Sequence, residues 1–429
     1  MMGLDIIGVF LGTLFVLLFI GVPIAFTLLL VSGAILFYIG TYNSQLIAQA
    51  VVYGANSFTL LAIPFFVLAG EIMSYGGISQ RIVDFVSCLV GHVRGGLGYV
   101  VILASIIFAG LSGSAVADAA ALGAILIPMM IKMGYDKATS VALVCASALI
   151  APIIPPSVPL ILFGVATSTS IGRLFMAGIV PGLILGVALM IFWYFMAKRN
   201  HYPVGKKATR KEIWESFKRS IFALVMPVII VGGIRFGIFT PTEAGCIACV
   251  YAFFISIVIY RELKPSDIIK VFISTSKTTG QVLLVAATAM STAWVVTTAG
   301  LPQAIAVALH GFAGSPILLV VVIAVFLIFL GMVMDSTPAI LIFAPIFMPL
   351  IKSAQIDPVY FGIIMVLDLM VGLITPPVGT VLFVGCGVGN VKFNELVQKI
   401  WPFIIVEFIV LFLYILIPQI ITVPLSWFI

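Results

Sequence analysis

Charged side chains are scarce in this chain of 429 residues. Asp, Glu, Lys and Arg make up only 8% of it, whereas 63% of the residues are hydrophobic and the mean hydropathy is +1.31. Soluble domains carry roughly 25% charged residues, and disordered chains combine low hydrophobicity with high charge, so the composition excludes both classes. It also excludes a nucleic-acid-binding face, because no basic stripe interleaved with aromatic residues is present.

Histidine and cysteine are equally rare. The chain has three His and five Cys, and Cys246 and Cys249 have the CxxC spacing without a neighbouring His or a second Cys pair. That spacing alone is weak evidence of a metal or redox site, so we expect both to be small residues that pack between helices. No P-loop sequence is present either, which argues against ATP hydrolysis.

Long apolar runs are what the chain has instead. Residues 221–234 and 317–329 contain no charged or hydroxyl side chain. A transmembrane helix needs roughly 20 apolar residues, and the length of the chain allows on the order of a dozen crossings. The sequence therefore predicts an all-α polytopic membrane protein whose surface is largely in contact with lipid.

Basic residues gather in one segment near the middle of the chain. Eight of the 21 Lys and Arg residues lie within residues 198–219. Cytoplasmic loops carry the excess of Lys and Arg, so this segment is predicted to be a cytoplasmic connector. Ile213, Trp214 and Phe217 fall on one side of a helix within it, which predicts a short interfacial helix.

The two parts beside the connector, residues 1–197 and 220–429, contain an internal repeat. A shift of 221 positions places four prolines of the first part on prolines of the second: Pro128 on Pro349, Pro155 on Pro376, Pro156 on Pro377 and Pro181 on Pro402. The two parts form inverted structural repeats if each crosses the membrane an odd number of times. Both termini are then predicted on the outer side of the membrane, opposite the connector, which is the periplasmic side if the membrane is a bacterial inner membrane.

Gly and Pro residues cluster at corresponding places in the two halves. Residues 110–118 match 331–338, and residues 151–157 match 373–379. In lipid, helix breakers are tolerated only where other groups satisfy the freed backbone, so these segments predict broken helices. Interrupted helices at matching positions of two repeats indicate a transport site.

The ends of broken helices can bind both cations and anions. Free carbonyls at the C-terminus of a half-helix coordinate a hard cation such as Na⁺, and free N–H groups at an N-terminus suit a carboxylate. With the nearby hydroxyl and carboxylate groups, the candidate Na⁺ ligands are Ser112, Gly113, Ser114, Pro152, Pro155, Ser157, Asp335, Ser336, Thr337, Thr375, Pro376 and Gly379. The candidate substrate-binding residues are Ser114, Asp118, Ser157, Asp335, Thr337 and Thr380.

Tight packing between helices is an alternative explanation of these clusters, since small and hydroxyl residues also mark such contacts in membranes. It does not account for Asp118 and Asp335, which are predicted to be buried. An ionisable group in mid-membrane is costly and is usually functional.

Four segments carry a resemblance to a known family. Residues 110–118, 151–157, 331–338 and 375–380 occur in this order, with the basic connector in the middle. Together they resemble the large membrane subunit of a tripartite ATP-independent periplasmic (TRAP) transporter, most of all those of sialic-acid systems. The resemblance implies Na⁺-coupled import of an organic carboxylate, with sialic acid favoured, across the bacterial inner membrane. The implied partners are a separate four-helix small membrane subunit and a periplasmic substrate-binding protein.

The same resemblance implies an elevator-type fold, in which a mobile transport domain slides against a scaffold. Its helical hairpins would lie near residues 45–78 and 270–300. The implied division is into scaffold segments 1–39 and 221–262, transport-domain segments 40–197 and 263–402 with the hairpins and broken helices, and a C-terminal helix, 403–429.

Two alternatives remain open. One is a stand-alone Na⁺/dicarboxylate symporter of related architecture, which would need no binding protein. The other is an intramembrane aspartyl protease that uses Asp118 and Asp335, since two aspartates that share a proton can perform such chemistry. The repeat argues against the protease, because the shift of 221 positions places Asp118 on Ala339. We therefore expect no enzyme activity.

Overall fold

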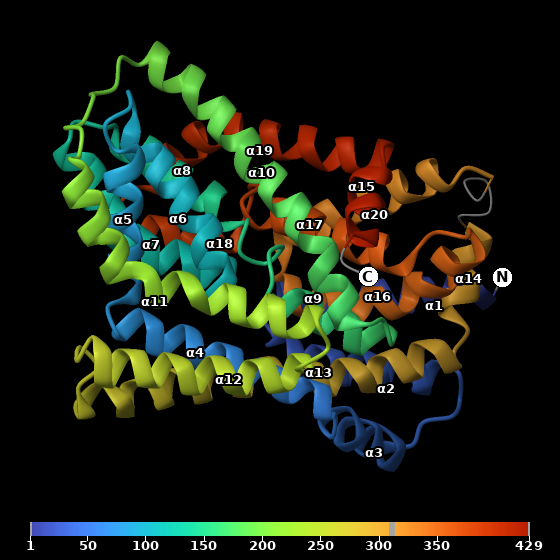
Figure 1. The fold of residues 1–429 in the computed structure, drawn as a ribbon. Coiled ribbons are helices and arrows are strands. Elements are labelled where there is room, and N and C mark those ends of the chain that lie inside the picture. The colour runs from blue at the N-terminus through green and yellow to red at the C-terminus, as the bar shows by residue number, and fades with distance from the viewer. Residues whose placement is uncertain (1, 309–313, 428–429) are drawn as a thin grey trace.

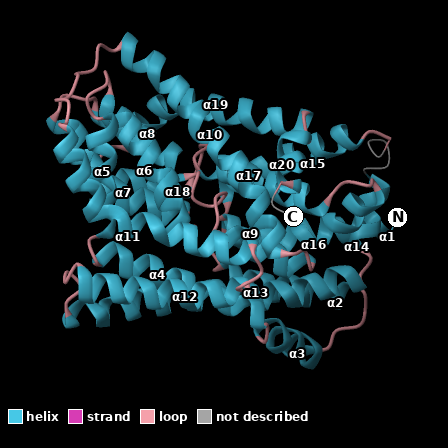
Figure 2. Cartoon of the chain, viewed as in Figure 1, coloured by secondary structure: helices cyan, strands magenta, loops and turns pink. Residues whose placement is uncertain are grey.

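Every regular element in the described part of the chain is a helix. The computed structural model describes residues 2–308 and 314–427, and Figures 1 and 2 show helices joined by turns and loops. Within these ranges, nine helices are long and apolar enough to cross a membrane. The predicted all-α membrane architecture is confirmed. Residue 1 of the first predicted scaffold segment and residues 428–429 of the predicted C-terminal helix lie outside the described residues.

The helices divide between the two halves of the chain. Those before the connector are α1 (Met2–Phe19), α2 (Ile24–Tyr38), α3 (Ser44–Ala55), the 3₁₀ turn η1 (Phe58–Leu61), α4 (Ala62–Tyr75), α5 (Ile78–Val90), α6 (Gly96–Ser112), α7 (Ala115–Lys132), α8 (Lys137–Ala148), α9 (Val158–Thr167) and α10 (Ile171–Arg199). Those after it are α11 (Arg210–Arg235), α12 (Pro241–Phe254), the π-helical turn η2 (Ile255–Ile259), α13 (Pro265–Thr298), α14 (Leu301–Ala308), α15 (Pro316–Val333), α16 (Ser336–Ser353), α17 (Pro358–Leu373), α18 (Thr380–Gly389), α19 (Phe393–Leu416) and α20 (Gln419–Ser426).

The helix boundaries contain the repeat that the prolines predicted. Helices α6–α10 recur in the same order as α15–α19, and the shift of 221 positions matches their first residues to within one position. α10 and its equivalent α19 run antiparallel, because Phe192 packs on Phe403 while the Tyr414 hydroxyl donates to the carbonyl of Pro181. Equivalent helices of opposite direction are what an inverted repeat requires.

The helix predicted inside the connector is longer than expected. α11 begins at Arg210, where Thr209 and Glu212 form a capping box, and it continues to Arg235 as a candidate membrane span. The prediction of a short helix confined to residues 198–219 is corrected accordingly. Its polar turns continue into the apolar run that follows because no helix breaker separates the two.

The second predicted hairpin, near residues 270–300, is also corrected. At the equivalent positions the first half has two helices, α3 and α4, whereas residues 270–300 of the second half lie mainly in the single 34-residue helix α13. Thr-Ser-Lys-Thr at 275–278 stands where the first half has Gly-Ala-Asn-Ser at 54–57, and Gly and Asn end helices readily. The hairpins of the two repeats are the equivalent pairs α6–α7 and α15–α16, and in the second pair Phe326 packs against both Phe343 and Phe347.

The first predicted hairpin, near residues 45–78, is corrected as well. The Ser291 hydroxyl of α13 donates to the Ile47 carbonyl of α3, and the Ser274 hydroxyl of α13 donates to Glu71 of α4. α3 and α4 therefore follow one another along α13 in the same direction as each other.

The C-terminal segment is not one helix. α19 passes through position 403 without interruption, and Pro418 stands between α19 and α20. Because proline lacks the N–H group that would continue the helix, the predicted single helix 403–429 is replaced by the end of α19 and a short α20.

Helices of the two halves interleave in the layer drawn lowest in Figure 1. α4 packs against α12 and α13, and α2 and α3 pack against α13. The hydroxyls of Ser32 in α2 and Thr292 in α13 share a hydrogen bond of 3.0 Å, and Gly54 of α3 lies against the backbone of Ala287 in α13. α5 packs on α11, and α1 packs on α14. Each half therefore supplies part of one shared layer.

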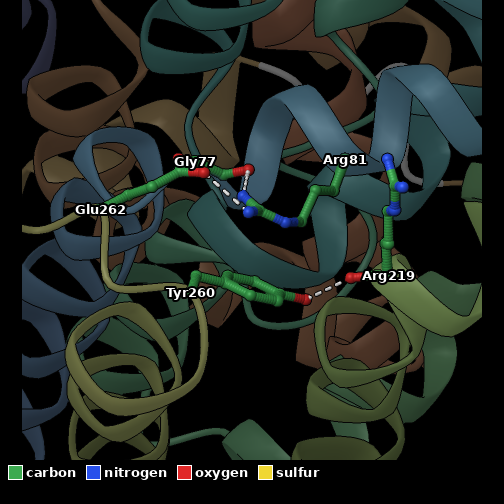
Figure 3. A network of polar contacts seen from close by, with 5 residues as sticks. All are labelled: Gly77, Arg81, Arg219, Tyr260 and Glu262. Carbon is green, nitrogen blue, oxygen red and sulfur yellow. Dashed lines mark hydrogen bonds and ion pairs between the residues drawn. The ribbon is translucent and has the colours of Figure 1, made fainter.

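A polar network ties α5 to the second half (Figure 3). The Arg81 guanidinium donates to Glu262 Oε1 at 2.6 Å and to the Gly77 carbonyl at 2.9 Å, and it lies 3.8 Å from the centroid of the Tyr260 ring. The Tyr260 hydroxyl donates to the carbonyl of Arg219 in α11 at 2.7 Å. The network holds the turn between α4 and α5 against α11 and against the loop that precedes α13.

We expect Arg81→Ala to lower the free energy of unfolding by about 1–2 kcal/mol, because it removes the cation–π contact and the charged hydrogen bond to Glu262. The matched control is Gln80→Ala on the same helix, which removes an exposed hydrogen bond to Asp84 and should cost at most about 0.5 kcal/mol. Chemical denaturation in mixed micelles measures both changes. Equal losses in the two variants would contradict a stabilising role of the network.

Candidate functional site

Two tight turns and two helix interruptions occupy equivalent places in the repeats. Residues 112–115 join α6 to α7 and are called tip 1, and residues 333–336 join α15 to α16 and are called tip 2. Residues 149–157 separate α8 from α9 and are called break 1, and residues 374–379 separate α17 from α18 and are called break 2. The predicted interruptions of the helices are thereby confirmed in both halves.

Tip 1 holds a hydroxyl and a carboxylate together inside the protein. Gly113 has a left-handed backbone (φ 62°), and Ser114 caps α7 by accepting a hydrogen bond from the Ala117 N–H at 3.4 Å. Ser112 Oγ donates to Oδ1 of Asp118, which is fully buried. Oδ2 of that carboxylate has no hydrogen-bond partner within the described residues. A buried polar atom without a partner is costly, so this oxygen is a ready acceptor for a ligand.

Break 1 lies directly against tip 1. Ser157 caps α9 by accepting from the Leu160 N–H at 3.2 Å, and its hydroxyl donates to the carbonyl of Pro152. A Cβ atom on Gly113 would collide with the carbonyl oxygen of Pro156, which follows Pro155 through a cis peptide bond. The backbones of tip 1 and break 1 therefore touch, and the candidate residues of the first half form one cluster.

Break 2 lies against the last turn of α15, directly before tip 2. The Gly379 N–H donates to the carbonyl of Met332 at 3.5 Å, and Gly331 packs against the backbone of Gly372. Thr375 Oγ1 donates to the carbonyl one turn before it in α17 at 2.6 Å. Pro376, like its equivalent in break 1, is followed by a cis peptide bond. The candidate residues of the second half form the second cluster.

The aspartate of tip 2 differs from that of tip 1. Asp335 is exposed, so the expectation that both aspartates are buried is corrected for this residue. Asp335 precedes the first turn of α16, whereas Asp118 lies one turn inside α7 and points into the packed core. Ser336 is 5% exposed, Thr337 is half-buried, and the buried Thr380 Oγ1 has no partner within the described residues.

Four helices start at the tips and breaks: α7, α9, α16 and α18. α18 runs antiparallel to α8, because Gly385 lies against Cys145 and Gly389 lies against Val141. α8 in turn packs antiparallel to α7 across a short turn, so α7 and α18, which are in contact, point the same way. Helix starts carry free N–H groups and positive dipole ends that favour a carboxylate. The ends of α6, α8, α15 and α17 offer carbonyl oxygens to a cation.

The candidate ligand atoms at both clusters are oxygen atoms. Within residues 2–308 and 314–427, no group of three or more His, Cys, Asp or Glu side chains could hold a metal ion. Transition metals favour nitrogen and sulfur ligands, whereas hard cations take oxygen ligands. Hydroxyls, carbonyls and one carboxylate at or beside each tip fit a hard cation.

Sequence reasoning did not identify α4 and α11 as the helices that pack against tip 1 and the end of α6. Gly70 of α4 faces Ser112, where an added Cβ would lie 3.6 Å from the Ser112 Cα, and Gly110 of α6 packs directly on Pro227 of α11. These glycines lie in apolar runs and carry no local signal of their contacts. Asp368 and Glu407 are fully buried, and neither carboxylate has a partner within the described part of the chain. Sequence reasoning does identify these two as ionisable groups in apolar sequence, but without a site role.

Comparison with known proteins agrees with the resemblance. A sequence profile of the family described as "Tripartite ATP-independent periplasmic transporter, DctM component" matches residues 11–420. The 2,3-diketo-L-gulonate TRAP transporter large permease protein of Escherichia coli (strain K12) is 49% identical over 98% of this chain and 99% of its own length. The sialic acid TRAP transporter large permease protein of Vibrio cholerae is 41% identical over 94% of each chain. The C4-dicarboxylate TRAP transporter large permease protein of Pseudomonas aeruginosa is 39% identical over 87% of each chain.

The fold also resembles a solved structure. The crystal structure of the Alcanivorax borkumensis YdaH transporter, described as having an unusual topology, aligns with a TM-score of 0.66 over 91% of this chain and 90% of that chain. The identity is 13%, so this likeness concerns the fold alone.

Repeated hairpins and interrupted helices of this kind define a polytopic secondary transporter. The chain belongs to the family of TRAP transporter large membrane subunits, the DctM component. It is accordingly a multi-pass protein of the bacterial inner membrane that takes part in secondary transport of organic acids. The relatives are transporter permeases and not enzymes, so the aspartyl protease interpretation is rejected.

Gly113→Ala should lower the free energy of unfolding by about 2–5 kcal/mol, because a left-handed alanine costs about 1–2 kcal/mol and overpacking against break 1 about 1–3 kcal/mol. Gly134→Ala is the matched control, since Gly134 also has a positive φ (87°) but nothing lies within 4 Å of an added Cβ. Denaturation in mixed micelles separates the two contributions. If both variants lowered the free energy of unfolding by the same amount, the close packing of Gly113 against the Pro156 carbonyl would be contradicted.

Proposed function

We propose that this chain is the transport subunit of a Na⁺-coupled importer of an organic carboxylate. A periplasmic binding protein delivers the substrate, and a separate four-helix small membrane subunit stands beside the scaffold. The observation that carries the proposal is the contact of tip 1 with break 1, together with that of break 2 with the end of α15 beside tip 2. These contacts gather helix starts, helix ends and oxygen side chains in both halves.

Na⁺ binds at the two clusters in this proposal. Ser112, Ser114 and carbonyls of break 1 supply ligands in the first half, and Asp335, Thr337 and Thr375 supply them in the second. Ser157 and the Pro152 carbonyl already bond to one another, so a cation there shares oxygens that are held in place. Coupling requires that Na⁺ bind the substrate-competent state preferentially. A cation that holds a tip against its break meets this requirement, because the same contact positions the helix starts.

The substrate carboxylate binds at the starts of α7, α9, α16 and α18, near Ser114, Asp335, Thr337 and Thr380. The buried, unpartnered Thr380 Oγ1 can donate to the carboxylate, whereas the unpartnered Asp118 oxygen can accept from a hydroxyl of the acid or bind a cation. The named substrates of the relatives are a diketo sugar acid, a sialic acid and C4-dicarboxylates. The relative with 49% identity is named for 2,3-diketo-L-gulonate, which is a sugar acid. We therefore favour a sugar acid as the substrate of this chain, and sialic acid is one candidate within that class.

Transport proceeds by an elevator movement in this proposal. The hairpins and broken helices move together. The surface along which they slide includes α11, from the predicted scaffold segment 221–262, and in this proposal also α4, which the division by residue ranges places in the transport domain. Gly110 contacts Pro227 and Gly70 contacts Ser112. These contacts support the arrangement, because glycine has no side chain that would hinder the sliding of one surface along the other. The basic connector is cytoplasmic, and both termini are periplasmic.

The decisive experiment is uptake by the chain reconstituted with its small subunit in vesicles. N-acetylneuraminate, 2,3-diketo-L-gulonate and succinate are supplied in turn, with and without the binding protein and with or without an inward Na⁺ gradient. The proposal requires uptake of one acid that depends on both. Uptake without the binding protein would favour the stand-alone symporter, and uptake without Na⁺ would contradict the coupling.

Asp335→Asn should reduce Na⁺-driven uptake at least about tenfold, which corresponds to about 1.4 kcal/mol, because it removes the charged ligand of the second cluster. The matched control is Asp84→Asn, an exposed aspartate of α5, which should leave uptake unchanged. Initial rates as a function of Na⁺ concentration measure the effect, and size-exclusion chromatography with the small subunit checks assembly. Unchanged uptake would remove Asp335 from the site.

A further inference from the structure

A polar cavity lies apart from the tips and breaks. It has a volume of about 520 Å³ and sits where the end of α9 and the start of α10 meet the turn between α16 and α17. Its lining includes the hydroxyl run 167–170, Arg173, Lys352 and Asp357. Pockets for small molecules have volumes of roughly 300–1,000 Å³, so the cavity is large enough for a sugar acid.

The cavity opens on the face opposite the basic connector. α10 begins at Ile171 beside the cavity and runs through 29 residues to Arg199 at the connector, a distance of about 43 Å. That distance is the thickness of a bilayer with its headgroups. In Figure 1, α10 runs diagonally from the connector at upper left towards lower right. Since the connector is proposed to be cytoplasmic, the cavity faces the side from which the substrate arrives.

The charges at the cavity are unequal. Arg173 and Lys352 are both basic, and Asp357 is the only acidic residue in the lining. Arg173 Nη2 lies 3.9 Å from Asp357 Oδ2, while Asp357 Oδ1 accepts a hydrogen bond from the Val359 N–H at 2.6 Å. Asp357 is thus partly engaged as the cap of α17, and Lys352 forms no ion pair within the described residues. The net formal charge of the cavity lining is therefore +1, and the four hydroxyl side chains of residues 167–170 lie beside it.

The repeat provides an internal comparison for this corner. The cavity lies between the α9–α10 turn and the α16–α17 turn, and the equivalent place in the repeat lies at the connector side, between the α18–α19 turn and the α7–α8 turn. There Lys137 crosses the corner and donates to the carbonyl of Asn390 at 2.7 Å. In the cavity, Pro358 stands in the place of Lys137 and Thr169 in the place of Asn390. Proline has no side-chain donor to cross the gap, so the cavity corner lacks this bridge.

We propose that this cavity is a carboxylate-binding site on the substrate-entry face, where Arg173 and Lys352 bind the acid before it reaches the tips and breaks. The inference rests on the proposed function, because the carboxylate is the proposed substrate. Arg173 offers a planar pair of N–H donors that matches a carboxylate, and residues 167–170 offer hydroxyls to the rest of a sugar acid. The same chemistry would also accept an acidic side chain of the delivering protein, but the volume favours a small molecule.

The test compares Arg173→Gln/Lys352→Gln with Lys132→Gln/Lys392→Gln, which removes two exposed basic residues at the connector-side corner. The acid that the wild-type complex transports is used as the probe. The cavity variant should raise the KM for uptake at least tenfold and change kcat less than twofold, and the control variant should change neither more than twofold. An equal rise of KM in both variants would assign the effect to general charge and overturn the site.

A binding measurement separates the two sources of carboxylate. The radiolabelled acid is titrated onto the purified complex without binding protein, in an Asp335→Asn background that weakens the proposed site at the tips and breaks. Saturable binding that falls at least tenfold in Arg173→Gln/Lys352→Gln supports the cavity site. If the cavity variant leaves this binding unchanged and alters only the dependence of uptake on binding-protein concentration, the residues contact that protein and the inference is overturned. Wild-type uptake in the same preparation tests the proposed function separately.

Discussion

The structure depends on one constraint: backbone groups freed by a helix interruption within an apolar protein must find partners inside it. Helix caps, close backbone packing and one bond between distant segments meet this constraint at the tips and breaks. Gly113 brings tip 1 onto the carbonyl of break 1, and the Gly379 N–H reaches the carbonyl of Met332 beside tip 2. Ser114 and Ser157 cap the helices that restart there. The requirement that makes a break costly in lipid therefore gathers helix ends and hydroxyls in two small volumes.

The repeat gives the two halves a common framework with different local chemistry. Helices α6–α10 and α15–α19 correspond almost position by position, yet Asp118 is buried against Ser112 and Asp335 is exposed beside the first turn of α16. The framework sets where a ligand can bind, and the side chains at each tip decide what it meets. The other helices also differ, since α13 is continuous where the first half has α3 and α4.

The network of Arg81, Tyr260 and Glu262 belongs to a different level of the structure (Figure 3). It joins a turn of the first half to a loop and a helix of the second, in the interleaved layer that both halves build. Sequence analysis assigned these residues no role, because their partners are up to 181 positions apart along the chain. Long-range polar contacts of this kind are visible only after the helices have been packed.

The amino-acid sequence by itself determined the membrane architecture, the repeat and the places where helices break. Apolar periodicity, Pro and Gly act within a few residues, so 112–115, 149–157 and their equivalents could be predicted from their own composition. Tertiary structure alone decided that tip 1 touches break 1, that Asp335 is exposed, and that α9, α10, α16 and α17 leave a polar cavity. These features depend on how distant helices pack, because the environment of a side chain is set by neighbours far away in the chain.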